Sequence, residues 1–343
     1  MVSKSVKLGF SLYGFHSLEH NQRLIRQFSQ AGFQFVFMSL NLEAKQEALS
    51  LQRLIADCHT HQLEVLADIN ATTYQQYGLE GLQALGLQAL RLDDGFSLSD
   101  VQRLAPHFRL VLNGSTLDFD FVQAIQSLPE AQQLVACHNY YPKPYTGLGI
   151  EAVRRLNQQW RALDIPTIAF ISGEVRRLPL YEGLPTVEAH RQARPLLAAL
   201  DLLVEGQTDW VCIGDTDVSP GSLADLNALA QGIIPIRAQL PEYLYGQSWT
   251  NRLDASDYVI RAIESRARLQ RQIFESRAIE RSTGDVVIAN QDFGRYAGEL
   301  EICLRSLPAD TRQDVVGQVV TDDLALLPYL RAPYAFCFTR PHF

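Results

Sequence analysis

The amino-acid sequence predicts an α/β fold, a (β/α)8 barrel followed by a small β-rich domain. Eight short runs of β-branched and aromatic residues alternate with amphipathic stretches over roughly the first 230 residues, the usual length of such a barrel. No GxGxxG motif follows the first run, which disfavours the alternative of an open, doubly wound sheet. Near Ile234 the alternation stops, and strand-like runs separated by turns take its place.

Eight predicted strands belong to the TIM barrel, and each reads as a nearly continuous apolar run. They are Lys7–Tyr13, Phe33–Leu40, Leu63–Asn70, Ala89–Asp94, Arg109–Ser115, Leu134–Tyr140, Ile165–Ser172 and Asp209–Asp215. Between them, apolar residues recur at helical spacing. The clearest stripes are Ala44, Ala48, Leu51, Ile55 and Cys58, and Ile150, Val153, Leu156, Trp160 and Leu163. Ser17 and Thr186 are predicted helix N-caps.

The boundary between the two predicted domains lies in a connecting segment, Arg237–Gln247. We therefore expect a barrel domain over 1–236 and a β-rich domain over 245–343. The second begins with a predicted helix, Ala255–Arg271. Its predicted strands are Asp285–Ala289, Glu299–Arg305, Asp314–Val320, Leu324–Leu330 and Tyr334–Phe338.

Composition excludes several classes of protein. A net charge of -8 argues against non-specific binding to nucleic acid or to an anionic membrane. The five cysteines show neither a CxxC nor a zinc-ligand spacing, so we expect reduced, mostly buried thiols. The polar segment Met1–Lys7 leads directly into the first strand, so we expect no signal peptide, and no apolar run is long enough to span a bilayer. These features predict a cytoplasmic protein.

Polar residues end nearly every predicted strand, at the face where (β/α)8 barrels carry their active sites. They are Ser11, Tyr13, Ser39, Asp68, Asn70, Arg91, Asp93, Asp94, Asn113, Ser115, His138, Asn139, Ser172 and Asp215. A single polar strand end needs no function, since it meets water. The whole set favours a polar cavity, because buried strands otherwise carry apolar residues. Arg91 and Asp93 are two residues apart, so we expect both on the lumen side of their strand.

Two predicted loops are longer and more aromatic than simple connections. The loop after the sixth strand reads HNYYPKPYTGL from His138, and the loop after the seventh reads SGEVRRLPLYEGLPT from Ser172. Aromatic faces with a few fixed polar groups suit a sugar ring, whereas Lys143, Arg176 and Arg177 suit a phosphate or carboxylate. The alternative is that the tyrosines pack each loop upon itself.

The same stretches resemble the 6-phospho-N-acetylmuramidase family. The resemblance rests on RLDDGF from Arg91, the loop after the sixth strand, YEGLPT from Tyr181 and NQDFGRYAGEL from Asn290, and it extends over essentially the whole chain. It implies a TIM barrel followed by a cyclophilin-like domain. It also implies cytoplasmic hydrolysis of 6-phospho-N-acetylmuramyl-N-acetylglucosamine, a disaccharide of bacterial cell-wall recycling.

Glycoside hydrolysis ordinarily uses two carboxyl groups, one as acid and one as nucleophile or base. We predict Asp93 and Glu182 as this pair, with Asp68 and Asp215 as further catalytic candidates. Alternatively, the 2-acetamido group of the substrate attacks, and spacing alone does not choose between these routes. The predicted substrate-binding residues are Arg91, Asn113, His138, Asn139, Tyr141, Lys143, Tyr145, Arg177, Arg295 and Tyr296. Arg91, Lys143, Arg176, Arg177 and Arg295 are candidates for the phosphate, and Arg295 also for the lactyl carboxylate.

Two other functions stay open from the sequence, although we expect no metal or cofactor. In the first, Asp68, Asp93, His138 and Asp215 hold a divalent cation in an isomerase or aldolase that acts on a sugar phosphate. In the second, the chain is a phosphosugar-binding regulator without turnover. The expected partner in each case is a small phosphorylated sugar, neither nucleic acid nor membrane.

Overall fold

The first compact unit, Val6–Asn227, is a closed barrel. The computed structural model describes residues 5–41, 48–131, 133–269 and 279–341. Eight parallel strands pair in chain order, and β1 also pairs with β8. The strands are β1 (Lys7–Leu12), β2 (Phe35–Ser39), β3 (Glu64–Ile69), β4 (Ala89–Leu92), β5 (Arg109–Asn113), β6 (Val135–Cys137), β7 (Thr167–Ile171) and β8 (Trp210–Ile213). The predicted barrel is confirmed, with each strand somewhat shorter than predicted.

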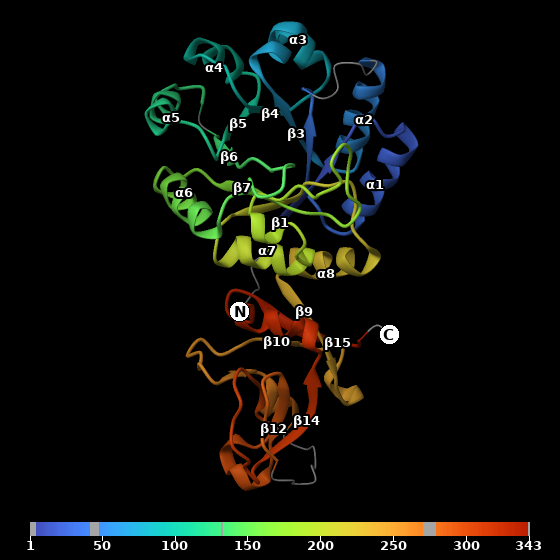
Figure 1. Cartoon of the computed structure of the whole chain (residues 1–343), viewed down its shortest axis with the longest axis vertical. Helices are drawn as coiled ribbons and strands as arrows, with labels where there is room; N and C mark the ends of the chain where they lie inside the picture. The colour runs from blue at the N-terminus through green and yellow to red at the C-terminus, as the bar shows by residue number, and fades with distance from the viewer. Residues whose placement is uncertain (1–4, 42–47, 132, 270–278, 342–343) are drawn as a thin grey trace. The chain divides into compact units, whose positions relative to one another are not determined.

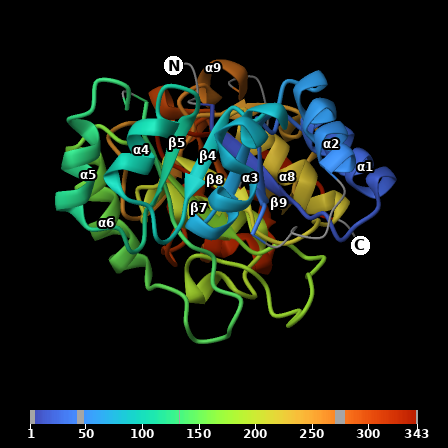
Figure 2. The ribbon, with the colours of Figure 1, turned by 90° about the horizontal axis from the view of Figure 1, so that it is seen from above.

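Helices surround the strands, as Figure 1 shows by looking along the barrel. They are α1 (Leu18–Gln30), α2 (Ala48–Thr60), α3 (Ala71–Ala84), α4 (Leu98–Leu104), α5 (Phe119–Gln126), α6 (Ile150–Ala162), α7 (Pro195–Val204) and α8 (Pro220–Ala230). In Figure 2 the barrel is seen from the side, and the loops after β6 and β7 extend beyond the strands together. These two loops therefore lie at the mouth formed by the carboxyl ends of the strands.

Side chains of alternating size fill the barrel interior. The interior cluster includes Phe35 and Phe37 of β2, Leu66 of β3 and Phe170 of β7. Gly9 of β1 is paired in register with Phe35, and a Cβ atom at Gly9 would overlap the Phe35 ring. The missing side chain thus makes room for a phenyl ring, which is the large-against-small packing that barrel interiors require.

Of the two predicted helix N-caps, one is confirmed and one is wrong. Ser17 caps α1, because its hydroxyl accepts a hydrogen bond from the His20 amide at 3.2 Å. Thr186 is not an N-cap. Its hydroxyl accepts from the Phe170 amide and donates to the Asn139 carbonyl, both at 2.9 Å, so it joins the loops after β6 and β7 to the barrel. Of the predicted α2 stripe, Ala44 lies outside the described residues.

The second compact unit contains the chain from Ala228 onward, and its sheet confirms the predicted β-rich domain. The strand order is β10-β15-β9-β14-β12-β13-β11. The strands are β9 (Ile233–Gln239), β10 (Ser248–Trp249), β11 (Val259–Arg261), β12 (Asp285–Ala289), β13 (Leu300–Cys303), β14 (Gln313–Val319) and β15 (Ala335–Thr339). Helical segments are α9 (Ser265–Leu269) and the 3-10 helices η2 (Glu242–Leu244), η3 (Gln291–Tyr296) and η4 (Thr321–Tyr329).

Three predictions for this unit were wrong. The segment predicted to connect the domains begins inside β9. The predicted helix Ala255–Arg271 contains β11 as well as α9, and its last two positions lie outside the described residues. The predicted strand Leu324–Leu330 lies in η4, where Pro328 has no amide to give to a sheet. At the start of η4, the carboxylate of Asp323 accepts hydrogen bonds from the backbone and side chain of Arg237. This buried ion pair fixes η4 against β9.

No helix in the described ranges is long and apolar enough to cross a membrane. The five cysteines are all free, and four of them are buried, as expected of reduced thiols. Burial raises the pKa of Cys58 and of Cys137 to about 12, so neither thiol ionises near neutral pH.

The packing of Gly9 against Phe35 gives a first testable prediction. Gly9→Ala should lower the free energy of unfolding by about 1–3 kcal/mol, because the added methyl group overpacks the barrel interior. Gly221→Ala is the matched control, since a Cβ atom at this exposed position of α8 meets nothing within 4 Å. It should leave stability unchanged or raise it by up to about 1 kcal/mol. Urea unfolding measures both; equal midpoints for the two variants would contradict the packing argument.

Candidate active site

A buried arginine occupies the centre of the polar cluster at the mouth of the barrel. Arg91, on β4, is 3% exposed. Its Nη1 donates to Asp68 on β3 at 2.6 Å and lies 3.4 Å from Asp93, and its Nη2 donates to Asn139 at 2.5 Å. Burial disfavours the charge of Arg91, but Asp68 and Asp93 more than offset this and keep the pKa of the guanidinium above its usual value. The cation is therefore permanent, and its partners take fixed positions around it.

Asp68 is committed to this cluster. Besides the bond from Arg91, its carboxylate accepts hydrogen bonds from Ser39 and Asn41, both at 3.1 Å. Its side chain is only 10% exposed. With donors on three sides, Asp68 acts as the counter-ion of Arg91 and has little surface to offer a substrate.

Asp93 is the more open carboxylate. Its side chain is 30% exposed, and its Oδ1 accepts from Asn113 at 3.0 Å in addition to the contact with Arg91. Arg91 and Asp93 therefore share one side of the chain at the end of β4, as predicted, and the next residue, Asp94, is exposed to solvent. Both partners donate to Asp93, so this group presents an oriented carboxylate to the mouth.

Asn113 and Asn139 complete the cluster from β5 and from the segment after β6. Asn113 Nδ2 lies 3.3 Å from Asn139 Oδ1, and Asn113 Oδ1 accepts from the Ser115 amide at 3.0 Å. Asn139 Oδ1 accepts from Arg91, which orients its Nδ2 as a free donor: no partner of Nδ2 is found within the described ranges. Asn139 is partly exposed, so this donor is available to a ligand.

Tyr13, Tyr140 and Arg177 form an aromatic side of the mouth, an association that the sequence did not predict. Tyr13 is 1% exposed and donates to the Gly214 carbonyl. The Arg177 guanidinium lies 4.6 Å from the centre of the Tyr13 ring and 5.8 Å from that of Tyr140. Tyr140 packs edge-on against Phe37 and Phe170 of the barrel interior. Burial raises the pKa of both tyrosines, so both hydroxyls remain protonated at neutral pH.

Asp215 anchors the loop after β7. It is 1% exposed, and its carboxylate accepts from the backbone amides of Gly173 and Leu184 at 3.0 Å. Burial raises the pKa of Asp215, and those backbone hydrogen bonds partly counter the effect. Since its side chain is wholly covered, the structure places Asp215 behind the mouth as the support of the loop.

A second anchor joins the loops after β6 and β7. Glu188, in the 3-10 helix η1 (Glu188–His190), accepts from the amides of Tyr145 and Gly147, both at 2.8 Å, and from Arg191 at 2.6 Å. The hydrogen bond from Arg191 is the main reason that the pKa of Glu188 is about 2. Arg191 also donates to the carbonyls of Gly183 and Lys143. We call this arrangement of Glu188 and Arg191 the loop clamp.

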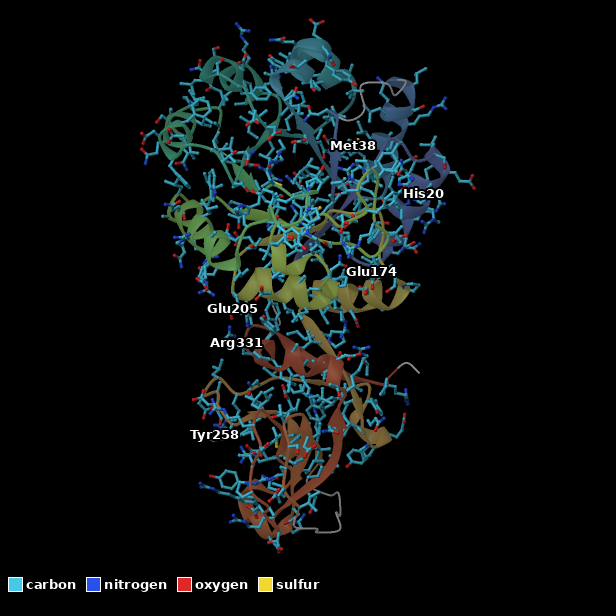
Figure 3. All side chains as sticks on the ribbon, viewed as in Figure 1. His20, Met38, Glu174, Glu205, Tyr258 and Arg331 are labelled. Carbon is cyan, nitrogen blue, oxygen red and sulfur yellow. The ribbon has the colours of Figure 1, made fainter. Side chains whose placement is uncertain are left out.

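The loop clamp leaves several predicted site residues exposed. Lys143, Tyr145 and Glu182 all face solvent, Tyr145 at 93% exposure, whereas Tyr141 is partly buried. Glu174, labelled in Figure 3, lies near the start of the loop after β7 and accepts from the Ser219 amide at 2.6 Å. The chain directly after Glu182 is fixed by Arg191, which donates to the Gly183 carbonyl, and by Asp215, which accepts from the Leu184 amide.

His138 does not face the mouth. It has no exposed surface, its Nε2 lies 2.7 Å from Asn157 Oδ1, and its Nδ1 lies 3.2 Å from Ser115 Oγ. Because Asn157 Nδ2 already donates to Gly206 and Thr208, Asn157 Oδ1 must accept, which places the His138 proton on Nε2. Burial lowers the pKa of His138 to about 4. His138 is therefore a neutral positioning residue, and the prediction that it orients substrate hydroxyls directly is corrected.

Three of the four residues of the metal alternative are committed to partners within the protein. Asp68 is occupied by Arg91, Asp215 by backbone amides, and His138 by Asn157 and Ser115. Within the described ranges, no group of three or more His, Cys, Asp or Glu side chains could hold a metal ion.

The second unit carries the two remaining predicted site residues, Arg295 and Tyr296. Arg295 donates to the Tyr296 hydroxyl at 2.7 Å, and both are exposed in η3.

Comparison with known proteins assigns a family. A family model described as 6-phospho-N-acetylmuramidase, N-terminal, matches residues 8–228, and one described as 6-phospho-N-acetylmuramidase, C-terminal, matches residues 234–339. A conserved Enterococcus faecalis protein of unknown function is 27% identical, with a TM-score of 0.80 over 98% of this chain and 96% of that one. An uncharacterized B. cereus protein is also 27% identical, with a TM-score of 0.81 over 98% and 100%. No curated protein matches the sequence.

The buried neutral state of His138 predicts a pH dependence of stability. Its folded pKa of about 4 lies below the ordinary value, so between the two the unfolded chain binds more protons. The stabilisation is complete above about pH 6.5, the ordinary pKa of histidine, and is lost as the pH falls towards 4. His138→Gln should be less stable at neutral pH by about 1–3 kcal/mol but should lose less stability on acidification. Urea unfolding of both proteins from pH 7 to pH 4 tests this; parallel curves would show that His138 does not titrate as argued.

Proposed function

Because the chain belongs to the 6-phospho-N-acetylmuramidase family, we propose that it is a glycosidase that hydrolyses 6-phospho-N-acetylmuramyl-N-acetylglucosamine or a related 6-phosphoglycoside at the barrel mouth. The observation that supports this site best is the oriented carboxylate of Asp93 beside Arg91 and Asn113. Cytoplasmic cell-wall recycling is part of the same proposal and rests on the family resemblance.

Asp93 and Glu182 are the proposed working pair. Among the four predicted catalytic carboxyl groups, Asp68 and Asp215 are buried by their own hydrogen bonds, whereas Asp93 and Glu182 keep open surface. Glu182 donates a proton to the leaving glycosidic oxygen as the C1–O bond breaks, and it regains a proton from the water whose oxygen then bonds to C1. Asp93 stabilises the positive charge that develops at C1, either directly or through the 2-acetamido group of the sugar.

The proposed phosphate site lies in the loop after β7. Three buried donors there have no hydrogen-bond partner within the described ranges: Ser172 Oγ, Arg176 Nη1 and Arg177 Nε. A Cβ atom at Gly183 would overlap Arg176 Nη1 and lie 2.8 Å from Ser172 Oγ, so these two donors adjoin each other. The charge of Arg91 is already balanced by Asp68 and Asp93, and Arg176 Nη1 lies 3.8 Å from the buried carboxylate of Asp215. Arg177 is therefore the better cation for a phosphate. Loops after strands seven and eight hold phosphates in many barrels of this class.

Other proposed contacts follow from the same mouth. Asn139 Nδ2 donates to a sugar hydroxyl, the aromatic side chains of Tyr140 and Tyr141 contact the ring, and Lys143 and Tyr145 adjoin from the clamped loop. For Arg295 and Tyr296, which belong to the second unit, a role towards the substrate stays a prediction from the sequence. The decisive experiment is product analysis with the purified full-length chain. Release of N-acetylglucosamine is expected, whereas binding without turnover would favour the regulator, and a rate that needs a divalent cation would favour the metal enzyme.

The carboxylate pair gives a prediction about rate. Asp93→Asn and Glu182→Gln should each lower kcat by about 10²–10⁴-fold with a much smaller change in KM, because both changes are nearly isosteric and remove chemistry rather than binding. Asp94→Asn and Glu174→Gln are matched controls, and both should turn over at close to the wild-type rate. An activated aryl glycoside needs little protonation and should partly rescue Glu182→Gln alone. If Asp93→Asn and Glu182→Gln both retain more than about a tenth of kcat, the assignment fails.

Selectivity for the 6-phosphate gives a separate prediction. Wild-type kcat/KM should be at least about tenfold higher for the phosphorylated than for the unphosphorylated disaccharide, as expected for one charge-assisted contact. Arg177→Met should reduce this ratio mainly by raising KM for the phosphorylated substrate. Arg155→Met is the control, because Arg155 is an exposed residue on the outer helix α6. Equal kcat/KM of the wild type for both disaccharides would contradict the phosphate site.

A further inference from the structure

The second unit contains a pocket of its own, with a volume of about 210 Å³. Strands β11, β12, β13 and β14 provide its base, with Arg261, Ala289, Glu301 and Gln313, and Glu299 precedes β13. Phe293 and Tyr296 of η3 line it as well, with their rings nearly perpendicular. The pocket is therefore built from neighbouring strands of one sheet and the 3-10 helix that connects two of them.

Two buried acceptors in this pocket have no donor. Glu299 is 4% exposed and Gln313 is 7% exposed, and neither Glu299 Oε2 nor Gln313 Oε1 has a hydrogen-bond partner within the described ranges. Arg261 and Arg266 approach the Glu299 carboxylate only to 3.8 and 3.7 Å. Gln313 Nε2 donates to Glu301 at 3.1 Å, and this hydrogen bond fixes the side-chain amide of Gln313 with its Oε1 directed away from Glu301 and without a donor within the described ranges. Since a buried acceptor without a partner costs free energy, the pocket is suited to a ligand that brings donors.

The charges around the pocket nearly cancel. Glu299 lies between Arg261 and Arg266, and burial together with the neighbouring Glu299 raises the pKa of Glu301 to about 7. A phosphate would meet the carboxyl groups of Glu299 and Glu301, and a simple cation would meet the guanidinium group of Arg261. A neutral ligand with hydroxyl groups avoids both repulsions and supplies the missing donors.

The size of the pocket limits the ligand further. Its volume corresponds to about seven liquid water molecules. Pockets for drug-sized ligands begin at about 300 Å³, so a single six-membered ring fits better than a disaccharide. Aromatic side chains with a few fixed polar groups are the usual surroundings of such a ring.

We propose that this pocket binds one neutral sugar ring, with hydroxyl groups donating to Glu299 Oε2 and Gln313 Oε1 and with Phe293 and Tyr296 against its apolar face. This site is additional to the hydrolytic site of the barrel and does not depend on turnover. It gives the second unit a carbohydrate-binding role of its own.

Glucose is the probe in the test, and the full-length protein is used. Amide hydrogen exchange should slow in β13 and β14 when glucose saturates the protein, and the titration gives Kd. Gln313→Met and Glu299→Gln should each weaken glucose binding about tenfold or more. Gln318→Met, at an exposed position of the same strand as Gln313, should leave Kd unchanged. Melting temperatures identify any variant that fails to fold. If Gln313→Met or Glu299→Gln fails to fold, the wild-type exchange pattern and the remaining variant still test the proposal.

Three outcomes would overturn the proposal. The first is no change in exchange of β13 and β14 at any soluble glucose concentration. The second is protection confined to the barrel loops, which assigns glucose to the hydrolytic site. The third is binding of ethylammonium, or of glucose 6-phosphate, in preference to glucose, which assigns the pocket to a charged ligand. Absence of glycosidase activity would leave all three readouts intact, so failure of the enzymatic proposal is separable from failure of this one.

Discussion

The active-site face of the barrel depends on one buried cation, the guanidinium of Arg91. A charge at 3% exposure is tolerated only when it is paired and fully hydrogen-bonded, and Asp68, Asp93 and Asn139 provide the pairing from three different strand ends. Loss of the cation would leave two carboxylates facing each other without compensation. The positions of the polar groups at the mouth are therefore interdependent, and the orientation of Asp93 is a consequence of the whole cluster rather than of its own strand.

Around this cluster, the two long loops are held by hydrogen bonds to backbone groups. Asp215 binds amides of the loop after β7, and Glu188 binds amides of the loop after β6. Carboxylates that accept from backbone amides fix the path of a chain without consuming its side chains. The side chains of Lys143 and Glu182 can therefore serve a ligand while the segments that carry them stay in place, which lowers the entropic cost of assembling a site.

The barrel was predictable because each of its strands is buried on both faces and therefore reads as a continuous apolar run. The pairing of Arg91 with Asp93 was predictable from the two-residue period of a strand. The roles of His138 and Asp215 were not, because a polar residue at a strand end reads the same whether it faces the mouth or supports a loop behind it. Tyr13 was noted only as a strand end, and Tyr140 only as one of several loop tyrosines. In the second unit, the apolar run that begins at Leu324 was wrongly predicted as a strand. Pro328 has no amide for a sheet, and the hydrogen bond from Arg237 to Asp323 holds the segment against β9 as a 3-10 helix.

The loop clamp also restricts how this protein can change over evolutionary time. Glu188 bonds the amides of Tyr145 and Gly147, while Leu148 forms an isolated bridge with Val187. A residue inserted into either loop near these contacts would shift that loop relative to the other and break the hydrogen bonds of Glu188 and the bridge between Leu148 and Val187 at the same time. Barrel enzymes usually diversify by altering each strand-following loop separately. Here the loops after β6 and β7 are bonded to each other and have to evolve together. A new specificity on this side of the mouth would therefore arise through substitutions in these loops rather than through insertions or deletions.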